Sequence, residues 1–364
     1  AAGAVRGAAK GVRFSGGRGG GGKPTDDPGF VQLSEGSVLR GSASGGTYIV
    51  EAYVASGSFS RVFRVRQGGQ TFAAKVMRAT DSYIQYSVDA RKEGALLRRL
   101  ERAQVDRGQR VLTMRCFDSF ACRDDLGVEY WCLILEWLDA SLFDVVRASG
   151  NRGLHLSMVR VLLIQLFEQL RVLQEHGCTH TDIKHKNCCL ADGSYFLAPG
   201  GPGGEPSVVL TDPVAKFIDY GNATLQGEPR TYPIHTKQFR APEVLINAGW
   251  GLPSDTWTLG ITAAFLVSGR LLFNTHDPEV LMRSIVDAVG PIDSALLRTA
   301  RNARLRRAAE AANASCGEPS LAVRLGLGGA AADSPEARCA DLVRLMLAPS
   351  PDARPSAAAA LAHP

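Results

Sequence analysis

The pattern of apolar residues changes once along this chain of 364 residues, and that change limits the folds it can adopt. Short runs rich in Val, Phe, Tyr and Thr occur at 47–54, 62–65 and 71–77, which is typical of strands separated by glycine-containing turns. After Ser141 the apolar residues recur at intervals of three and four, most clearly over 157–176, which is typical of helices. We therefore expect an α+β chain whose strands come mainly first and whose helices follow.

The remaining elements are predicted from the same two periodicities. They are a helix over 85–100, strands over 111–117 and 129–135, a helix over 254–268 and partly helical structure over 296–332. The Pro- and Gly-rich stretch 197–213 is predicted to be an inserted loop between two β-like segments.

The first 30 residues differ in composition from the rest of the chain. They contain 10 of the 39 glycines and five cationic against two acidic side chains, which is +3 of the net charge of +5. With so few large apolar side chains, this stretch cannot offset the entropy cost of ordering itself. We predict a disordered Gly/Arg-rich tail and lead-in over 1–47. A solubilising or linker role is favoured over direct nucleic-acid binding.

Two kinds of segment are missing from the pattern. The longest apolar runs, such as 261–267, are far shorter than the ~20 residues of a membrane helix, and no apolar signal segment follows the basic start. The eight cysteines form no Cys-x-x-Cys pair, so neither a zinc site nor a disulfide framework is indicated. We expect a soluble, unexported chain that does not bind a membrane.

Three motifs in the helical half carry chemically active groups in a fixed order. They are His180-Thr181-Asp182-Ile183-Lys184-His185-Lys186-Asn187, Asp219-Tyr220-Gly221 and Ala241-Pro242-Glu243. In the strand-rich half, Gly57 lies in a loop between two β-like runs, and Lys75 follows on the next run. Because a strand rather than a helix follows the glycine loop, a strand-loop-strand flap over nucleotide phosphates fits better than a Rossmann turn.

Together these motifs resemble the eukaryotic protein kinase family, with its Gly-rich loop, strand lysine, catalytic loop, Asp-Phe-Gly and Ala-Pro-Glu segments. The resemblance covers about residues 48–363. It implies a bilobal protein kinase fold in one domain, 48–364. A small antiparallel β-sheet N-lobe with one main helix would span 48–137, and a mainly helical C-lobe 138–364. It also implies ATP and Mg²⁺ as cofactors and ATP-dependent protein serine/threonine kinase activity.

The chemistry of phosphoryl transfer suggests a role for each residue of the catalytic motifs. Asp182 would accept the proton of the substrate hydroxyl, and Lys184 would offset negative charge near the transferred phosphate. Asn187 and Asp219 would hold Mg²⁺, which prefers oxygen ligands.

Lys75 would hold the α- and β-phosphates if a carboxylate positions it. Glu93, on the helix predicted over 85–100, is the best candidate for that carboxylate.

The family resemblance adds residues that the chemistry alone does not single out. Leu135 would be the gatekeeper, and the backbones of Glu136 and Leu138 would contact adenine. The adenine ring would be enclosed by Val62, Ala73 and Cys189, and the ribose would be reached by Ser141 and Asp144. Val54 would lie with Gly57 in the loop over the nucleotide. Thr236 would bond to the catalytic Asp182 and Lys184. Glu243 would pair with Arg354, and Asp255 would brace the catalytic loop.

Several segments resemble the CDC-like (LAMMER) kinases of the CMGC group. They are His180-Thr181-Asp182, the stretch 217–224, the insertion before it, and 236–250. The name-giving signature is absent, because 280–287 reads Val-Leu-Met-Arg-Ser-Ile-Val-Asp. PRP4-like and DYRK-like kinases therefore remain alternatives.

A protein of another class also remains open. His185-Lys186 replaces the usual Pro-Glu, and two loop glycines are replaced by Ala55 and Ser60. These departures are compatible with a pseudokinase scaffold that binds partners without turnover. The retained Lys75 and Asp182 favour the enzyme.

The resemblance to CDC-like kinases implies protein substrates rich in Arg and Ser, namely splicing factors, with autophosphorylation that can include tyrosine. It implies a monomer in the nucleus or cytoplasm. The arginine run over 298–307 is interpreted as a solvated face rather than a docking site for acidic partners. Thr181 replaces the arginine that normally pairs with a phosphorylated activation loop, so activity without that phosphorylation is expected.

Overall fold

The computed structural model describes residues 6–8, 29–41, 45–79, 83–199, 204–230 and 233–364. The chain divides into two compact units, one of residues 10–140 and one of residues 1–9 together with 141–364. Each unit is described by itself below. Among the described residues, no helix has both the length and the apolar character needed to cross a bilayer.

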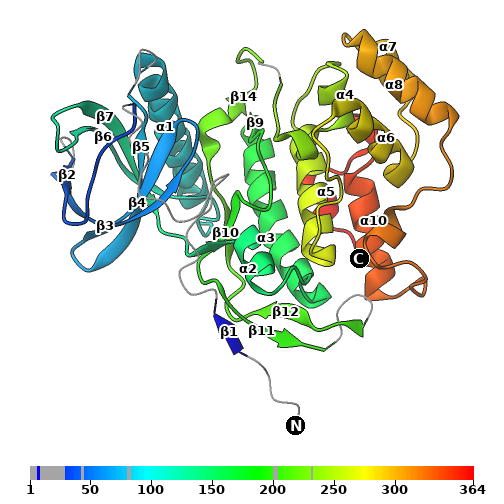
Figure 1. Cartoon of the computed structure of the whole chain (residues 1–364), viewed down its shortest axis with the longest axis horizontal. Helices are drawn as coiled ribbons and strands as arrows, with labels where there is room; N and C mark the ends of the chain where they lie inside the picture. Colours follow the sequence, from blue (N-terminus) through cyan, green and yellow to red (C-terminus); the bar gives the residue numbers. More distant parts are fainter. Residues whose placement is uncertain (1–5, 9–28, 42–44, 80–82, 200–203, 231–232) are drawn as a thin grey trace. The chain divides into compact units, whose positions relative to one another are not determined.

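The unit of residues 10–140 contains a six-stranded antiparallel sheet and one long helix (Figure 1). The strands lie in the order β2-β3-β4-β5-β7-β6. Their bounds are β2 (Val38–Arg40), β3 (Thr47–Ser56), β4 (Ser60–Gln67), β5 (Gln70–Met77), β6 (Cys116–Arg123) and β7 (Glu129–Glu136), and the helix is α1 (Tyr83–Asp106). The helix packs against β5, β6 and β7. The strands predicted over 47–54, 62–65, 71–77 and 129–135 are confirmed, as is the helix predicted over 85–100.

Residues 29–41 differ from the disordered lead-in that the sequence predicts over 1–47. Phe30, Val31 and Leu39 are buried at 7%, 1% and 1% exposure, and β2 pairs with β3. Arg61, itself buried, donates to the Val31 carbonyl at 2.8 Å and lies 4.9 Å from the Phe30 ring centroid. The difference arises because these few apolar side chains pack against the sheet. The prediction is also wrong for residues 6–8, which form a strand (β1) paired with residues 194–196, and for Thr47, which begins β3. Residues 1–5, 9–28 and 42–44 of the predicted tail lie outside the described residues.

The larger unit is mainly helical. Its helices are α2 (Leu142–Ala148), α3 (Leu156–Glu175), α4 (Pro242–Leu245), α5 (Pro253–Ser268), α6 (Pro278–Val289), α7 (Ser294–Arg298), α8 (Ala303–Ala314), α9 (Leu321–Arg324), α10 (Pro335–Met346) and α11 (Ala357–Leu361). The central one is α5, since every residue from Ser254 to Val267 is buried. It packs against α3 and α10 (Figure 1). The helices predicted over 157–176 and 254–268 are confirmed, and 296–332 is helical in part, as expected.

Short strands occupy the loops of this unit. They are β1 (Arg6–Ala8), β9 (Cys178–Thr179), β10 (Cys188–Leu190), β11 (Ser194–Ala198), β12 (Ser207–Leu210), β13 (Ala215–Phe217) and β14 (Thr224–Leu225), while β8 (Ala140–Ser141) lies at the division between the units. Pairing is antiparallel between β10 and β13, between β9 and β14, and between β11 and its neighbours β1 and β12.

Two predicted elements are wrong in extent. The strand expected over 111–117 runs instead over 116–123. The Gln104 side chain accepts from the Leu112 amide at 2.7 Å and donates to the Thr113 hydroxyl at 2.8 Å, which holds that stretch outside the sheet. The inserted loop expected over 197–213 contains β12, because Val208 and Leu210 are buried and β12 pairs with β11.

Candidate active site

Asp182 lies at the centre of a hydrogen-bonded network in the loop between β9 and β10. Its Oδ2 accepts from Lys184 Nζ at 2.7 Å and from Asn187 Nδ2 at 3.0 Å, and its Oδ1 accepts from the Thr236 hydroxyl at 2.9 Å. Lys184 Nζ also donates to Thr236 Oγ1 at 2.9 Å. The contacts predicted for Thr236 are therefore present, and they fix the carboxylate in one orientation.

Asp255 holds the backbone of this loop from beneath. Its two carboxylate oxygens accept from the amides of His180 at 2.6 Å and Thr181 at 3.0 Å, which confirms the predicted brace. Asp255 is fully buried, and burial raises the pKa of its carboxyl to about 7 against the opposing effect of those two amides. Thr181 has a φ of 70°, in the left-handed region, and its hydroxyl donates to the Asn222 carbonyl at 3.0 Å. The contacts with Asp255 and Asn222 together stabilise this uncommon backbone conformation.

Asn187 and Asp219 lie at the same end of two paired strands. Cys188 of β10 is opposite Phe217 of β13, and the amide of Ile218 donates to the Asn187 carbonyl at 2.9 Å. Asp219 follows with a φ of 66°, in the left-handed region. Mg²⁺ is commonly held by one or two protein oxygen ligands together with substrate phosphates. An amide oxygen beside a carboxylate fits that requirement, so these residues could hold the ion.

Lys75 and Glu93 form a buried ion pair in the smaller unit. The ammonium on β5 lies 3.0 and 2.8 Å from the two oxygens of the carboxylate on α1, and the residues are 9% and 3% exposed. The predicted pairing is therefore present. A lysine held by both oxygens of one carboxylate presents its charge in a fixed direction.

Three of the residues predicted around adenine, Val62, Ala73 and Leu135, share one face of the sheet with Lys75. Val62 is opposite Lys75 and Ala73 is opposite Leu135 across the strand pairs, so all four project to the same side. The neighbouring residues that alternate with them, such as Phe63 and Ala74, belong to the hydrophobic core on the other side. This face is the one that carries the Lys75–Glu93 pair. Val54 on β3 is half-buried, and Glu136 and Leu138 follow Leu135.

The loop at Gly57 is a tight connection between β3 and β4. Ala55 and Ser60, which replace two glycines, are strand residues: Ala55 pairs with Val62, and Ser60 pairs with Met77 of β5. The Gly57 amide donates to the Ser60 carbonyl at 2.8 Å. The flap expected over the phosphates is thus a β-hairpin, and the two replacements extend its strands.

Ser141 and Asp144 satisfy each other at the beginning of α2. The Asp144 amide donates to the Ser141 hydroxyl at 3.1 Å, and the Ser141 amide donates to Asp144 Oδ2 at 3.2 Å, which is a capping box. The Ser141 hydroxyl also donates to Asp144 Oδ2 at 2.6 Å. Burial raises the pKa of the Asp144 carboxyl. The structure thus gives both predicted ribose contacts a role in the helix cap. Cys189 is buried on β10, and burial raises the pKa of its thiol well above its usual value.

Glu243 and Arg354 form the predicted pair deep in the larger unit. Two parallel contacts of 2.7 Å join them, and both side chains are at most 1% exposed. This pair anchors the Ala241-Pro242-Glu243 segment at α4 to the chain near α11.

His185 makes buried aromatic contacts that the sequence does not reveal. Its ring packs against Phe265, Phe143 and Phe239 at centroid distances of 4.3, 4.9 and 5.3 Å. Neither ring nitrogen has a hydrogen-bond partner among the described residues. Burial, together with the charges of Lys186 and Lys184, lowers the pKa of this imidazole to about 3. The only sequence signal is that a histidine replaces proline in the motif.

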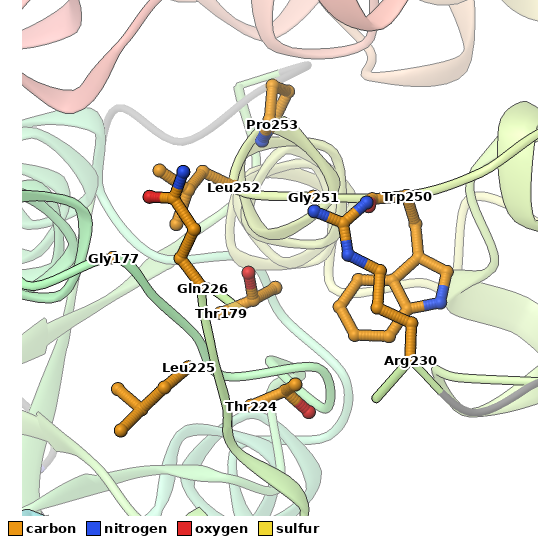
Figure 2. Close-up of a pocket in the computed structure, with 10 residues that line it drawn as sticks. All are labelled: Gly177, Thr179, Thr224, Leu225, Gln226, Arg230, Trp250, Gly251, Leu252 and Pro253. Carbon is orange, nitrogen blue, oxygen red and sulfur yellow. The ribbon is translucent and has the colours of Figure 1, made fainter. Parts of the chain in front are cut away.

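A cavity of about 210 Å³ lies elsewhere in the larger unit (Figure 2). It is lined by Gly177, Thr179, Thr224, Leu225, Gln226, Arg230, Trp250, Gly251, Leu252 and Pro253. Among the described residues that line it, the one charged side chain is that of Arg230, which lies over the Trp250 ring and donates to the Trp250 carbonyl. None of the predicted site residues lines this cavity, so it is separate from the catalytic network.

Comparison with known proteins places the chain in a wider context. A family model described as "Protein kinase domain" matches residues 48–364. Human dual specificity protein kinase CLK2 is 27% identical over 257 residues, covering 70% of this chain and 50% of that protein. Serine/threonine-protein kinase AFC1 of Arabidopsis thaliana is 28% identical over 280 residues, covering 74% and 56%. The chain thus spans about half the length of the curated relatives it matches.

A solved structure shows the same fold. The crystal structure of the PF14_0431 kinase domain superposes with a TM-score of 0.75 at 23% identity, covering 93% of this chain and 99% of the other. The bilobal kinase fold class predicted from the sequence is confirmed by this likeness and by the family model.

Proposed function

Because the chain belongs to the protein kinase family, we propose that it transfers the γ-phosphate of ATP to serine and threonine hydroxyls of proteins. The observation that carries the proposal is the network around Asp182. Phosphoryl transfer requires alignment and charge neutralisation more than covalent help, and this network supplies a fixed carboxylate beside a fixed ammonium.

The hydrogen bonds leave Asp182 one direction in which to accept a substrate proton. Oδ2 accepts two bonds, from Lys184 and Asn187, whereas Oδ1 accepts one, from Thr236. A carboxylate oxygen has about two lone pairs, so Oδ1 can take one more donor. An acceptor hydroxyl at that lone pair is held at the general base.

The positive charges of the site would act on two groups, the catalytic carboxylate and the phosphates of ATP. Lys184 donates to Asp182 Oδ2, so its ammonium lies beside the catalytic carboxylate. From there it would offset the negative charge of the transferred phosphoryl group. When bound, ATP supplies the phosphoryl group and Mg²⁺ neutralises its oxygens. Asn187 and Asp219 would hold the ion, and Lys75, positioned by Glu93, would hold the α- and β-phosphates.

The proposed substrate class is Arg/Ser-rich protein segments, with tyrosine autophosphorylation. The Arg/Ser-rich class rests on the resemblance to the CDC-like kinases, and the tyrosine autophosphorylation on the likeness to proteins named as dual specificity kinases, of which CLK2 is one. Splicing factors are the proposed physiological substrates, and the nucleus or cytoplasm the proposed compartment.

The direct test is transfer of labelled phosphate with Mg²⁺-ATP to an Arg/Ser-repeat peptide, a proline-directed peptide and an acidic peptide. The Asp182→Asn variant keeps the shape of the side chain and removes the base. We expect it to lose at least about 100-fold in kcat with an unchanged unfolding midpoint. Equal rates for Asp182→Asn and the parent would refute the assignment. Absence of transfer to every peptide would instead favour a scaffold without turnover.

A further inference from the structure

Two cations meet at one aromatic ring beside the catalytic loop. Lys186 Nζ lies 4.6 Å from the centroid of the Phe143 ring, and Arg147 Cζ lies 5.8 Å from the same centroid. Lys186 follows β9 in the catalytic loop, and Arg147 lies in the last turn of α2. Like charges repel, so a ring shared by two cations is a place where an added anion is favourable.

The described residues supply no ion pair to either cation. Arg147 is exposed and Lys186 is half-buried. Asp144 is a carboxylate whose charge acts on Lys186, and it is tied to the Ser141 hydroxyl in the capping box. Among the described residues, the Asp144 carboxylate accepts from the hydroxyl and the amide of Ser141 and forms no ion pair with Lys186 or Arg147.

The backbone fixes Lys186 relative to Asp182. On one side, His185 is wedged among aromatic rings and accepts from the Phe143 amide at 3.2 Å. On the other side, the Asn187 amide donates to the Lys184 carbonyl at 2.8 Å, and the Asn187 side chain binds Asp182. Lys186 therefore projects from the same rigid turn that presents Asp182.

We propose that Lys186 and Arg147 form a cationic subsite that binds an anionic side chain of the substrate polypeptide near the acceptor hydroxyl. The proposal rests on the proposed function and defines its substrate class further. Arginine and lysine bind phosphate and carboxylate through charge-assisted hydrogen bonds, so the ligand is a phosphoserine, aspartate or glutamate. In an Arg/Ser repeat the next serine is two residues away. The first phosphate added therefore supplies the anion that favours the second.

The test compares matched peptides that differ at one position. Each carries a single acceptor serine, with alanine, glutamate, phosphoserine or arginine two residues from it on either side. For the parent chain we expect kcat/KM about tenfold higher with phosphoserine than with alanine, and a lower value with arginine. The effect should lie in KM with kcat unchanged, because the contact is the same in the ground and transition states. The glutamate and phosphoserine arms distinguish an acidic residue from a prior phosphorylation.

Charge reversal separates the subsite from general electrostatics. The double variant Lys186→Glu/Arg147→Glu should lose the preference for phosphoserine and gain one for arginine. Arg307→Glu/Arg324→Glu, two exposed arginines of the larger unit, makes the same change in net charge elsewhere and should keep the parent's preference. If the two double variants behave alike, the subsite is refuted.

A binding measurement keeps the inference testable without turnover. Fluorescence anisotropy of a labelled phosphoserine peptide is measured with chains carrying Asp182→Asn. We expect about tenfold weaker binding when Lys186→Glu/Arg147→Glu is added, and no change with Arg307→Glu/Arg324→Glu. Equal affinity for all three chains would overturn the subsite even if the enzyme is active. Lack of phosphate transfer together with the expected loss of affinity would refute only the proposed function.

Discussion

His185 is a polar side chain in an apolar position, and the free-energy cost of burying its imidazole should depend on pH. The folded state holds the imidazole neutral, with its pKa lowered to about 3, whereas the unfolded chain has the ordinary value of 6.5. Between these values the unfolded state binds more protons, so this residue makes stability rise with pH and fall as the pH drops below about 6.5. At pH 5 the cost relative to pH 8 is about 2 kcal/mol.

His185→Phe should remove that dependence, because a phenyl ring keeps the packing against Phe143, Phe239 and Phe265 and carries no titratable group. We expect the change in free energy of unfolding on substitution to be about 2 kcal/mol more favourable at pH 5 than at pH 8. Urea denaturation at both pH values measures this difference, and any constant packing cost cancels from it. An identical substitution effect at the two pH values would contradict the buried neutral imidazole.

Thr181 leads to a prediction about regulation at the residue scale. Its hydroxyl donates to the Asn222 carbonyl, and its carbonyl accepts from the His235 amide at 3.1 Å, so neutral contacts tie the catalytic loop to the following segments. A residue without charge cannot respond to a phosphate on the activation loop. We expect phosphatase treatment to leave the phosphotransfer rate within about twofold. Mass spectrometry checks that all phosphate is removed, and a rate that falls to background would disprove the prediction.

At the same scale, motif residues could be predicted better than residues with several possible uses. The contacts of Thr236 with Asp182 and Lys184 could be predicted from the resemblance to the protein kinase family, because all three residues stand at positions of its motifs. The sequence does not distinguish a ribose contact from a helix cap for Ser141 and Asp144. A serine three residues before an aspartate serves either purpose, and only the backbone at the beginning of α2 decides.

At the scale of elements, Gly153 marks a close approach between α5 and the segment before α3. A Cβ atom at this position would lie 1.9 Å from the Val267 carbonyl oxygen, and the next residue's amide donates to the Leu266 carbonyl at 2.7 Å. We expect Gly153→Ala to reduce the free energy of unfolding by about 3 kcal/mol, because backbone atoms must move apart. Gly317, where a Cβ meets nothing within 4 Å, offers the control. Gly317→Ala should stay within about 0.5 kcal/mol in the same urea titration. Equal costs at the two positions would contradict the close approach.

Long elements could be predicted because their periodicity is repeated, whereas short ones depend on partners. The pattern over 157–176 repeats through nearly six turns, and the structure has α3 there. β6 begins later than the predicted strand because Gln104 holds residues 112–113 outside the sheet. β12 forms within the stretch predicted to be a loop because it pairs with β11. Tertiary contacts of this kind leave no local signal.

For the whole molecule, the question is where the folded chain begins. The family model and the predicted domain both begin at residue 48, yet Phe30, Val31 and Leu39 are buried in the smaller unit. Burying three such side chains contributes about 5 kcal/mol, which is a large fraction of a typical total stability of 5–15 kcal/mol. Composition failed here because an average over 30 residues hides a few apolar side chains that dock on a sheet.

We therefore expect a chain of residues 48–364 to be at least about 4 kcal/mol less stable than a chain of residues 29–364. Besides the apolar area, the shorter chain leaves the buried Arg61 without the Val31 carbonyl and the Phe30 ring. Urea unfolding of both chains measures the difference. Val31→Ala in the longer chain isolates one side chain and should cost about 1 to 2 kcal/mol by itself. Coincident midpoints for the two chains would show that residues 29–41 contribute nothing to the folded state, and the domain would then begin at residue 48.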